Sequence, residues 1–285
     1  MAIRIVTDST AGLTREFVEE MNVKELPLYF RFDDEVFVEN DMDLEEFYKK
    51  MDASPSIPAT SQPSYLQVYQ TYEELLKQGH EVIGIFISSA FTGPYNLSRM
   101  VLEELQENYP DSRVELIDSK MAAMGLGYPV QEAAKAAAAG VAFDEIVKNT
   151  RNLLENAHVV FVPETLENLK KGGRIGSAAA LLGSLLEIKP LLVLQRGKVE
   201  VLKKCRGNKS AEEAMLRVLM KDAKDFGIIY IVVHYCHALE RGRHVWQMVY
   251  DRLGLKSELD DLSPVIAIHA GEGTVGIAYF TERHS

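Results

Sequence analysis

Residues 82–94 read Val82-Ile83-Gly84-Ile85-Phe86-Ile87-Ser88-Ser89-Ala90-Phe91-Thr92-Gly93-Pro94. The apolar run predicts a buried strand, and the residues after Pro94 have the pattern of a helix. The hydroxyl groups between them therefore follow the carboxyl end of a strand and precede the amino terminus of a helix. In α/β proteins this junction binds anions, because the first N–H groups of the helix and its dipole favour negative charge. The stretch predicts an α/β fold and a small acidic ligand.

The composition narrows the class of protein. At 285 residues the chain is long enough for two domains with separate cores. Its 42 acidic and 31 basic side chains give a net charge of −11, which disfavours nucleic acid as a partner. With Cys205 and Cys236 as the only cysteines, we expect no disulfide framework and a reducing, cytoplasmic location. The first residues have the pattern of a strand rather than a signal peptide, and no apolar run approaches the ~20 residues of a membrane helix.

Strand-like and helix-like segments alternate in the first half of the chain. Ser64 and Gln67 have the spacing of a capping box, which predicts a helix start. We predict strands at residues 3–6, 81–87 and 114–117, and helices at residues 14–21, 44–51, 65–78, 95–108, 122–139 and 144–156. This alternation favours βαβ units. We assign residues 1–157 to a Rossmann-like α/β domain with a parallel sheet and the hydroxyl loops.

The second half has a different pattern, which predicts a mixed sheet. Ser210 and Glu213 have capping-box spacing, and Gly254 predicts the end of another helix. We predict strands at residues 159–162, 228–233, 265–268 and 275–280, a hairpin of 191–194 with 199–203, and helices at 164–171, 177–186, 210–226 and 244–253. We assign residues 158–285 to a second α/β domain with a mixed sheet, which carries a Gly172-Gly173-Arg174 hinge and His269.

Three polar loops are expected at one edge of the first sheet. They are residues 7–10, 59–63 and 88–93. Each loop by itself is explained by helix capping, because Ser, Thr and Asp are the preferred capping residues. Their convergence at the carboxyl ends of strands makes a ligand site equally plausible. Hydroxyls without a nearby base fit binding better than nucleophilic catalysis.

Histidines raise two further possibilities. His269 lies beside glycines and can donate to an anion, although a structural role is the more common one for a single histidine. Residues 271–276 match the dinucleotide pattern Gly-x-Gly-x-x-Gly, which we reject because no helix follows them. His234 and His237 lie on either side of Cys236. Successive residues of a strand face opposite sides of the sheet, so we expect no metal site there.

A cationic segment, Lys170-Lys171-Gly172-Gly173-Arg174, stands out in an acidic chain. It is either a solvated turn that caps a helix carboxyl terminus or a hinge that binds an anionic partner or phosphate. An apolar face follows it. Such a face is core by default, and the alternative is the lining of a tunnel for an acyl chain; its residues are Ile175, Ala178, Leu181, Leu182, Leu185 and Leu186.

These loops belong to a longer series of short motifs. In chain order they are Val6-Thr7-Asp8-Ser9-Thr10, Thr60-Ser61-Gln62-Pro63-Ser64, Ser88-Ser89-Ala90-Phe91-Thr92-Gly93, Ile117-Asp118-Ser119-Lys120, Leu169-Lys170-Lys171-Gly172-Gly173-Arg174-Ile175, Ile188-Lys189-Pro190 and residues 264–271. In order and spacing the series resembles the DegV family, the bacterial fatty-acid-binding proteins that serve fatty acid kinases.

The resemblance implies a two-domain α/β fold with a lipid buried between the domains. By motif position, the family's carboxylate-binding threonine falls on Thr60, next to Ser61. The family's serine falls on Thr92, with Gly93 beside it, and its histidine falls on His269. These five residues form the predicted carboxylate site.

Two positions depart from the family pattern. Thr92 replaces the usual serine, which keeps the hydroxyl but stiffens χ1. Pro94 replaces the usual threonine and removes an N–H that could face the anion. Glu272 also places a negative charge near His269 in the sequence. These differences bear on acyl selectivity and on carboxylate affinity.

The predicted function is that of a lipid carrier and not of an enzyme. A long-chain fatty acid is expected to lie in a buried tunnel and to present its carboxylate to a separate ATP-dependent kinase, which forms the acyl-phosphate. Lys170, Lys171 and Arg174 are candidates for contact with the kinase or with phosphate. We expect a bound fatty acid as the ligand, and no cofactor or metal.

Two alternatives remain open from the residues alone. One is an enzyme that acts on a small phosphorylated or carboxylated metabolite, with His269 as the acid/base and Asp8 as its orienting group. The other is an interaction protein with no ligand.

Overall fold

The computed structural model describes residues 2–183 and 188–282. The chain divides into two compact units. Unit 1 contains the described residues up to Asp43 together with Thr60–Leu154. Unit 2 contains Leu44–Ala59 and the described residues from Glu155 onward. Residues 44–59, although early in the sequence, therefore group with the second half of the chain.

Unit 1 is built on a four-stranded parallel sheet in the order β2-β1-β6-β7. Its strands are β1 (Ile3–Asp8), β2 (Lys24–Leu26), β6 (Glu81–Phe86) and β7 (Val114–Asp118). All three neighbouring pairs run parallel, so the carboxyl ends of the strands lie at one edge of the sheet. This confirms the parallel α/β sheet that the alternating pattern predicts.

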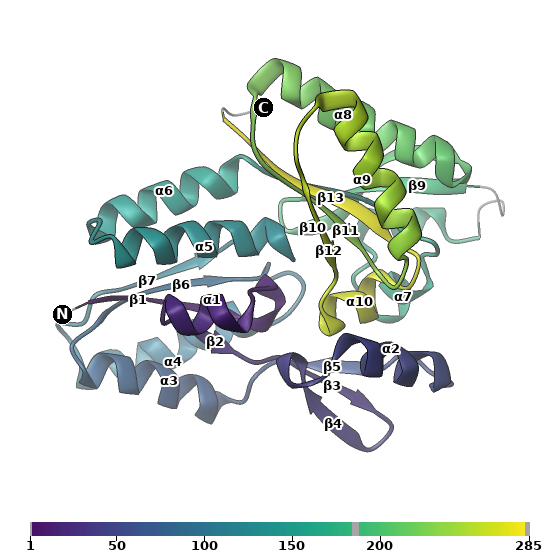
Figure 1. Ribbon diagram of the computed structural model, residues 1–285. Coiled ribbons are helices and arrows are strands. Elements are labelled where there is room, and N and C mark those ends of the chain that lie inside the picture. Colours follow the sequence, from purple (N-terminus) through teal and green to yellow (C-terminus); the bar gives the residue numbers. More distant parts are fainter. Residues whose placement is uncertain (1, 184–187, 283–285) are drawn as a thin grey trace. The chain divides into compact units, whose positions relative to one another are not determined.

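Helices cover both faces of this sheet (Figure 1). α3 (Tyr65–Lys77) and α4 (Pro94–Asn108) pack on one face, whereas α5 (Met124–Ala138) and α6 (Phe143–Glu155) lie on the other. A short helix, α1 (Arg15–Glu20), follows the first strand. The core under α3 and α4 includes Val6, Val68, Tyr72, Val82, Phe86, Val101 and Leu105.

The start of α3 confirms the predicted capping box. The Ser64 hydroxyl accepts a hydrogen bond from the Gln67 backbone N–H at 3.3 Å, and the Gln67 Oε1 atom accepts from the Ser64 N–H at 2.9 Å. Two of the four unpaired N–H groups at this helix end are thereby satisfied.

A second, three-stranded sheet in this part of the chain is not predicted by the periodicity. Its order is β4-β3-β5, with β3 (Tyr29–Phe32), β4 (Glu35–Val38) and β5 (Ala59–Ser61). Strands of three or four residues are too short for alternation to reveal them. The hairpin of β3 and β4 is held by contacts among its aromatic rings, including a stacked pair of Phe30 and Phe37 with centroids 5.6 Å apart.

Unit 2 is built on a six-stranded mixed sheet in the order β10-β9-β8-β13-β11-β12. The strands are β8 (Ala157–Val162), β9 (Ile188–Gln195), β10 (Lys198–Arg206), β11 (Ile228–Tyr235), β12 (Glu258–Asp261) and β13 (Val275–Thr281). Only β11 and β12 form a parallel pair among these neighbours. The mixed sheet and the β9–β10 hairpin are both confirmed.

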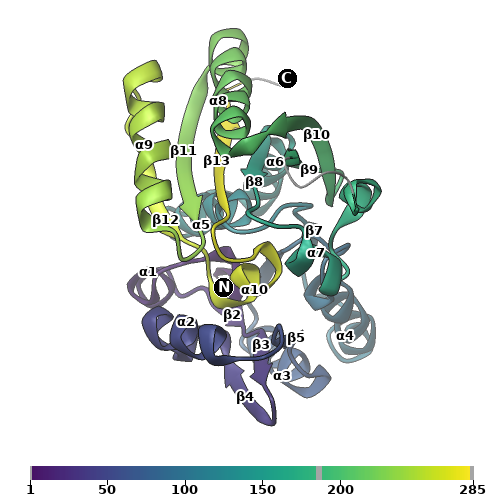
Figure 2. The same cartoon turned by 90° about the vertical axis from the view of Figure 1, so that its right-hand side faces the viewer.

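Among the described residues, five helices belong to unit 2 in addition to a segment of 3₁₀ helix. α8 (Gly207–Phe226) and α9 (Leu239–Leu253) lie side by side against the sheet (Figure 2). α7 (Glu167–Lys171) and α10 (Pro264–Ala270) are short and pack on each other, and α2 (Leu44–Ala53) comes from the early segment. The core between the sheet and the two long helices includes Val160, Leu191, Met215, Leu219, Val233, Val245 and Ile277.

The expectation of a strand at residues 265–268 is wrong, because these residues lie in α10. Pro264 occupies the first turn, where its fixed φ suits a helix, and Ser263 precedes it in an extended conformation. A short apolar run bounded by Pro and Gly cannot be assigned to strand or helix from its periodicity alone. His269 therefore lies in the last turn of a helix rather than at a strand end.

Two helix predictions in the second half need correction. α8 begins at Gly207, so Ser210 and Glu213 lie inside the helix and do not cap it. Residues 177–186 do not form one helix: Gly176–Leu181 is a 3₁₀ helix, and residues 184–187 lie outside the described part of the chain. Strand β12 is not predicted from the sequence, because three of its four residues, Glu258-Leu259-Asp260-Asp261, are acidic. It lies at the edge of the sheet.

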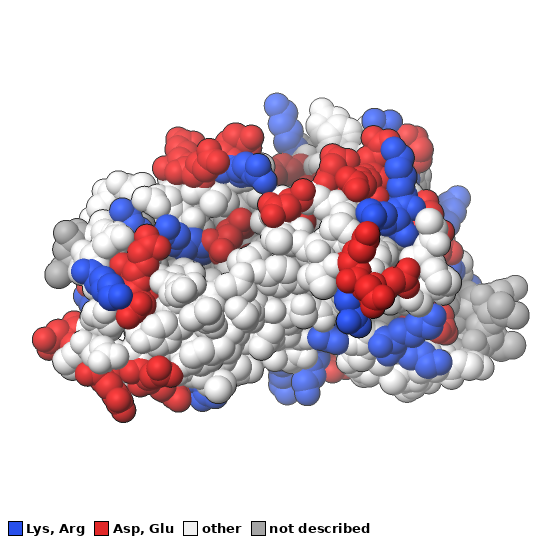
Figure 3. Space-filling view, turned by 90° about the horizontal axis from the view of Figure 1, so that it is seen from below, with Lys and Arg blue, Asp and Glu red and all other residues white. Residues whose placement is uncertain are grey.

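The surface carries charged side chains of both signs (Figure 3), as the composition leads one to expect. In Figure 3, acidic and basic side chains of the described residues alternate on the face shown, around a broad uncharged area. No continuous basic surface is visible on that face among the described residues. Within the same residues, no helix combines the length and the apolar character needed to cross a membrane.

Candidate functional site

The first polar loop, residues 7–10, is part of the folded core. Asp8 is fully buried, and its Oδ2 atom accepts a hydrogen bond from the Ile87 N–H at 2.8 Å. Its Oδ1 atom accepts from the backbone N–H and the hydroxyl of Thr10. Burial raises the pKa of Asp8 to about 6, although these hydrogen bonds oppose the rise. Asp8 thus joins the ends of β1 and β6 and is engaged in structure, which counts against its use as the orienting group of an enzyme.

The serines of the third loop are likewise engaged in structure. The Ser89 hydroxyl donates to the Asp118 Oδ2 atom at 2.7 Å, and the Ser89 N–H donates to Oδ1 at 3.1 Å. Ser88 is buried, and its hydroxyl accepts from the Ala90 N–H at 3.3 Å. These contacts fix the loop against the end of β7. They leave Thr92 and Gly93, both partly exposed, at the start of α4.

The amino terminus of α4 has the properties of an anion site. Gly93 is its N-cap residue and supplies no side-chain cap, and Pro94 occupies the first turn. In a helix of 15 residues the N–H groups that follow the cap carry the positive end of the dipole. The N–H missing at Pro94 reduces this set of donors by one.

The structure brings the second and third loops together. A Cβ atom built on Gly93 would lie 2.8 Å from the Gln62 Cδ atom and closer still to its Oε1 atom, so Gln62 packs directly on the Gly93 backbone. Gln62 follows Thr60 and Ser61, which lie in β5 and are partly exposed and exposed, respectively. The loops 59–63 and 88–93 therefore meet at the start of α4, whereas the loop 7–10 is buried.

The second predicted group of site residues lies in unit 2. A Cβ atom built on Gly172 would lie 3.0 Å from the His269 Cε1 atom and closer to Nδ1, so the imidazole rests on the Gly172 backbone. The Asn168 Nδ2 atom donates to the Ile268 carbonyl at 2.9 Å, which joins α7 to α10. Gly172 was identified only as part of a hinge, and the structure shows that its lack of a side chain makes room for His269.

The electrostatics around His269 favour a neutral imidazole. Burial, and then the nearby charge of Arg174, lowers the pKa of His269 to about 4. Arg174 is itself partly buried and donates to the Gly172 carbonyl, and burial lowers its pKa. An arginine stays charged in proteins, so this pair offers a neutral N–H donor beside a cation.

The three predicted cations therefore fall into two groups. Arg174 belongs with Gly172 and His269, whereas Lys170 and Lys171 are exposed at the end of α7. Thr60, Ser61, Thr92 and Gly93 all belong to unit 1, and the other predicted residues belong to unit 2.

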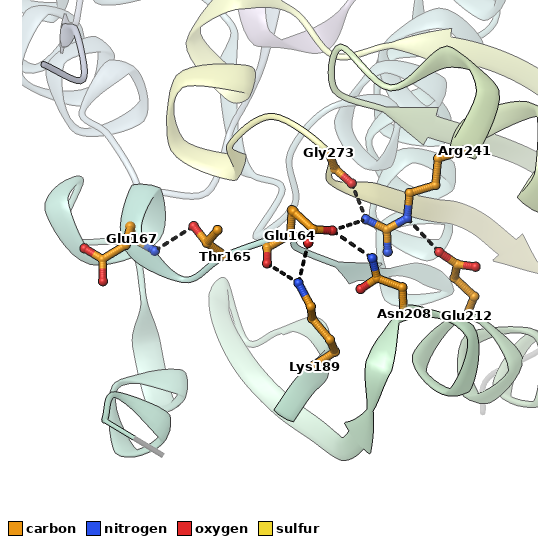
Figure 4. Close-up of polar contacts among 8 residues, drawn as sticks. All are labelled: Glu164, Thr165, Glu167, Lys189, Asn208, Glu212, Arg241 and Gly273. Carbon is orange, nitrogen blue, oxygen red and sulfur yellow. Dashed lines mark hydrogen bonds and ion pairs between the residues drawn. The ribbon is translucent and has the colours of Figure 1, made fainter. Parts of the chain in front are cut away.

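A polar network that the sequence does not reveal supports the loop after His269 (Figure 4). Glu164 accepts from Arg241 at 3.0 Å, from Asn208 at 2.8 Å and from Lys189, and Arg241 also donates to the Gly273 carbonyl. Burial raises the pKa of Glu164, but its hydrogen bonds outweigh this effect and the pKa is lowered overall. Lys189 belongs to one of the quoted motifs, but nothing in the sequence marks Glu164 or Arg241, because their partners are distant along the chain.

The fold and these contacts define a class of two-unit α/β proteins with polar loops at a parallel-sheet edge and a histidine–arginine pair on the other unit. The chain belongs to the DegV family, whose family model matches residues 2–282. A DegV domain-containing protein of Clostridium perfringens is 39% identical over 282 residues, which cover 99% of this chain and 100% of the relative.

Solved structures in the family have the same fold. A fatty acid binding DegV family protein from Streptococcus agalactiae is similar with a TM-score of 0.90 and 27% identity, covering 99% of this chain and 100% of that one. A DegV family protein from Thermus thermophilus, described for its fatty acid binding, gives a TM-score of 0.87 and 29% identity over the same shares. DegV of Bacillus subtilis, a fatty acid binding protein, gives 0.84 and 26% identity and covers 99% of each chain.

Proposed function

We propose that this protein binds a long-chain fatty acid and presents its carboxylate to a separate kinase. The observation that carries the proposal is the amino terminus of α4, where the Thr60 loop meets Thr92 and Gly93. A carboxylate at this position gains hydrogen bonds from backbone N–H groups and hydroxyls, together with the favourable end of the helix dipole. The fatty-acid binding of several structural relatives supports the same class of ligand.

His269 and Arg174 are proposed carboxylate-binding residues of unit 2. A neutral imidazole donates one hydrogen bond without needing a proton from solvent, and the guanidinium supplies the compensating charge. This division of roles follows from the lowered pKa of His269 and from the partial burial of Arg174.

The acyl chain is proposed to supply most of the affinity through apolar burial. Each buried methylene contributes roughly 0.8 kcal/mol before the cost of ordering the chain is subtracted. Ala178 and Leu181 of the predicted apolar face are buried, whereas Leu182 is exposed; Leu185 and Leu186 lie outside the described residues.

The kinase step is assigned to a partner, because the sequence contains no phosphate-binding loop of the Gly-x-x-x-x-Gly-Lys type. Lys170 and Lys171 are the proposed contacts with that partner or with the new phosphate, since they are exposed next to the residues that would bind the carboxylate.

Mass spectrometry of the purified chain tests the ligand. We expect the native spectrum to contain a mass increment that organic extraction releases as a fatty acid. An apo mass that stays unchanged after incubation with several fatty acids would contradict the proposal and would favour the soluble-metabolite enzyme.

Variants test the site. Thr92→Val keeps the shape of the side chain but removes the hydroxyl, and we expect fatty-acid affinity to fall roughly tenfold, as for loss of a hydrogen bond to a charged group. Thr71→Val is the matched control, because the Thr71 hydroxyl only donates to the Gln67 carbonyl within α3. Equal affinities of both variants would remove Thr92 from the site.

Hydroxylamine trapping tests the division of labour with the kinase. With ATP, fatty acid and a fatty acid kinase present, we expect acyl hydroxamate to form only when both proteins are present. Hydroxamate formed by this chain alone with ATP would mean that the chain is itself an enzyme.

A further inference from the structure

A cluster of metal-ligating side chains lies in unit 2, outside the residues assigned to fatty-acid binding. Asp52, His237 and Glu272 each place one ligand atom so that all three atoms lie within 4.8 Å of one another. The residues come from the end of α2, the loop after β11 and the loop after α10. Each is exposed, so an ion could reach the cluster from solvent. From this geometry we propose that Asp52, His237 and Glu272 bind a divalent metal ion, with Zn²⁺ as the preferred ion.

The ring and the backbone of His237 are both tied to neighbouring residues. Its ring stacks on Tyr48 with centroids 4.2 Å apart and an interplanar angle of 5°. The Tyr48 hydroxyl donates to the Asp261 Oδ1 atom at 2.7 Å, and the backbone N–H of His237 donates to the same oxygen at 3.4 Å. An imidazole that is already stacked on a neighbouring ring loses less conformational freedom when it binds a metal, which favours binding.

Helix α2 contributes twice to the cluster. Tyr48 and Asp52 are four residues apart, so they lie on the same face of the helix. The helix therefore presents the ring that orients His237 and, one turn later, a carboxylate beside it. From the loop after α10, the Glu272 Oε1 atom is 3.5 Å from the His237 Nδ1 atom.

The chemistry of the three ligands selects the class of ion. Imidazole nitrogen and carboxylate oxygen together suit Zn²⁺, which lies about 2.0–2.2 Å from each of its ligand atoms. The three ligand atoms, which lie within 4.8 Å of one another, therefore need to approach by roughly 1 Å to bind one ion. Three protein ligands leave a coordination position for water. Two adjacent carboxylates in a chain of net charge −11 also favour a cation electrostatically.

The strand alternation that disfavours a metal site at His234-Tyr235-Cys236-His237 does not extend to His237. β11 ends at Tyr235, so His237 lies beyond the strand and does not follow its alternation. Its φ of 47° places the backbone in the left-handed region. His234, by contrast, is buried in the strand, with its Nδ1 atom 3.3 Å from Asp260.

The bound ion would connect α2 to the loop that follows His269, because Glu272 is only three residues beyond that histidine. This proposal does not depend on fatty-acid binding, and it can be tested on the protein without lipid.

Titration of the tag-free full chain with Zn²⁺ after chelator treatment tests the proposal. We expect one Zn²⁺ per chain, measured by competition with a fluorescent chelator and by elemental analysis. Asp52→Asn, His237→Gln and Glu272→Gln should each lower the affinity at least tenfold. These residues are exposed, so the variants should keep the fold, which circular dichroism and thermal unfolding will verify. His244→Gln, an exposed histidine of α9, is the matched control and should bind as the wild type does.

Two results would overturn the proposal. One is a wild-type chain that retains no Zn²⁺ in the competition assay. The other is Zn²⁺ binding that all three variants leave unchanged, which would place the ion on other groups such as the cysteine thiols.

Discussion

The imidazole of His269 rests on the backbone of Gly172, where a Cβ atom would come within 3.0 Å of the His269 Cε1 atom. This contact joins two segments that are about 100 residues apart in the sequence. It also explains why the first residue of the Gly-Gly-Arg segment is a glycine. The φ of Gly172 is −72°, which any residue could adopt. The requirement at Gly172 is for space and not for backbone freedom.

The first prediction follows from this contact. Gly172→Ala should displace the imidazole and weaken fatty-acid binding at least tenfold, because the added methyl meets the ring of His269. Gly173→Ala is the control: Gly173 has a φ of 71° and nothing lies within 4 Å of its Cβ position. We expect it to lower the free energy of unfolding by roughly 1 kcal/mol through backbone strain, with fatty-acid affinity unchanged. Equal losses of affinity in both variants would contradict the steric role.

The second prediction concerns Gln62 and Gly93. Gly93→Ala forces the Gln62 side chain away from the start of α4, and because Gln62 is an exposed, flexible side chain, stability should fall by less than about 1 kcal/mol. A double-mutant cycle with Gln62→Ala, read out by fatty-acid affinity, should give a coupling energy of roughly 0.5 kcal/mol or more, since the two residues touch. Additive effects would show that the two loops act independently.

The third prediction concerns the stability of the lipid-free protein at low pH. His269 has a pKa of about 4 in the folded protein and an ordinary value of 6.5. Between these values the unfolded chain binds more protons than the folded one, so the contribution of His269 to stability is lost as the pH falls from 6.5 toward 4. Since each pKa unit corresponds to about 1.4 kcal/mol, the loss should approach roughly 3 kcal/mol.

Denaturant unfolding of the wild type and of His269→Gln, measured from pH 7 to pH 4, checks this expectation. The difference between the two stability curves should change over this range, because only the wild type carries the titrating imidazole. Curves that stay parallel would contradict the assignment of a buried, neutral His269. His244→Gln, on the surface of α9, serves as the control.

The fourth prediction concerns the carboxyl group of Glu25 in unit 1, for which the change of stability with pH has the opposite sign. Burial, and then the charge of Glu39, raises the pKa of Glu25 to about 7. A raised pKa means that the folded state binds more protons than the unfolded state between about pH 4 and 7. The contribution of Glu25 should therefore destabilise the protein as the pH rises through this range.

Glu25→Gln tests this point, because it removes the charge and keeps an oxygen for the hydrogen bond from the Asn40 side chain. The variant should be more stable than the wild type at pH 8 by about 1–2 kcal/mol, and its stability should depend less on pH. Glu16→Gln, at an exposed position of α1, should leave the pH profile unchanged. A Glu25→Gln variant with the wild-type profile would show that Glu25 is not buried as a charge.

The sequence alone determined those features that depend on neighbouring residues. The parallel sheet of unit 1, the capping box of Ser64 and Gln67 and the β9–β10 hairpin all follow from local periodicity, capping chemistry and turns. The motif series was also sufficient for the family, since each motif is a short segment with its own spacing.

Local patterns failed where a segment is short or its packing is set elsewhere. Residues 265–268 form a helix, because Pro264 starts one, although the same apolar letters would suit a strand. The β3–β4 hairpin is stabilised by contacts among Phe30, Phe32 and Phe37 rather than by alternation.

Only the tertiary structure decided which polar residues are available to a ligand. Ser89 lies in the same loop as Thr92, and Asp8 lies in a similar polar loop. Yet Ser89 donates to Asp118 and Asp8 accepts from the Ile87 N–H, and these hydrogen bonds engage both residues in the fold. The partners of His269 and His237 likewise come from helices far away in the sequence. Contacts of this kind depend on how whole elements pack, and because packing brings together residues that no local pattern relates, the sequence by itself could name the candidate groups but not their neighbours.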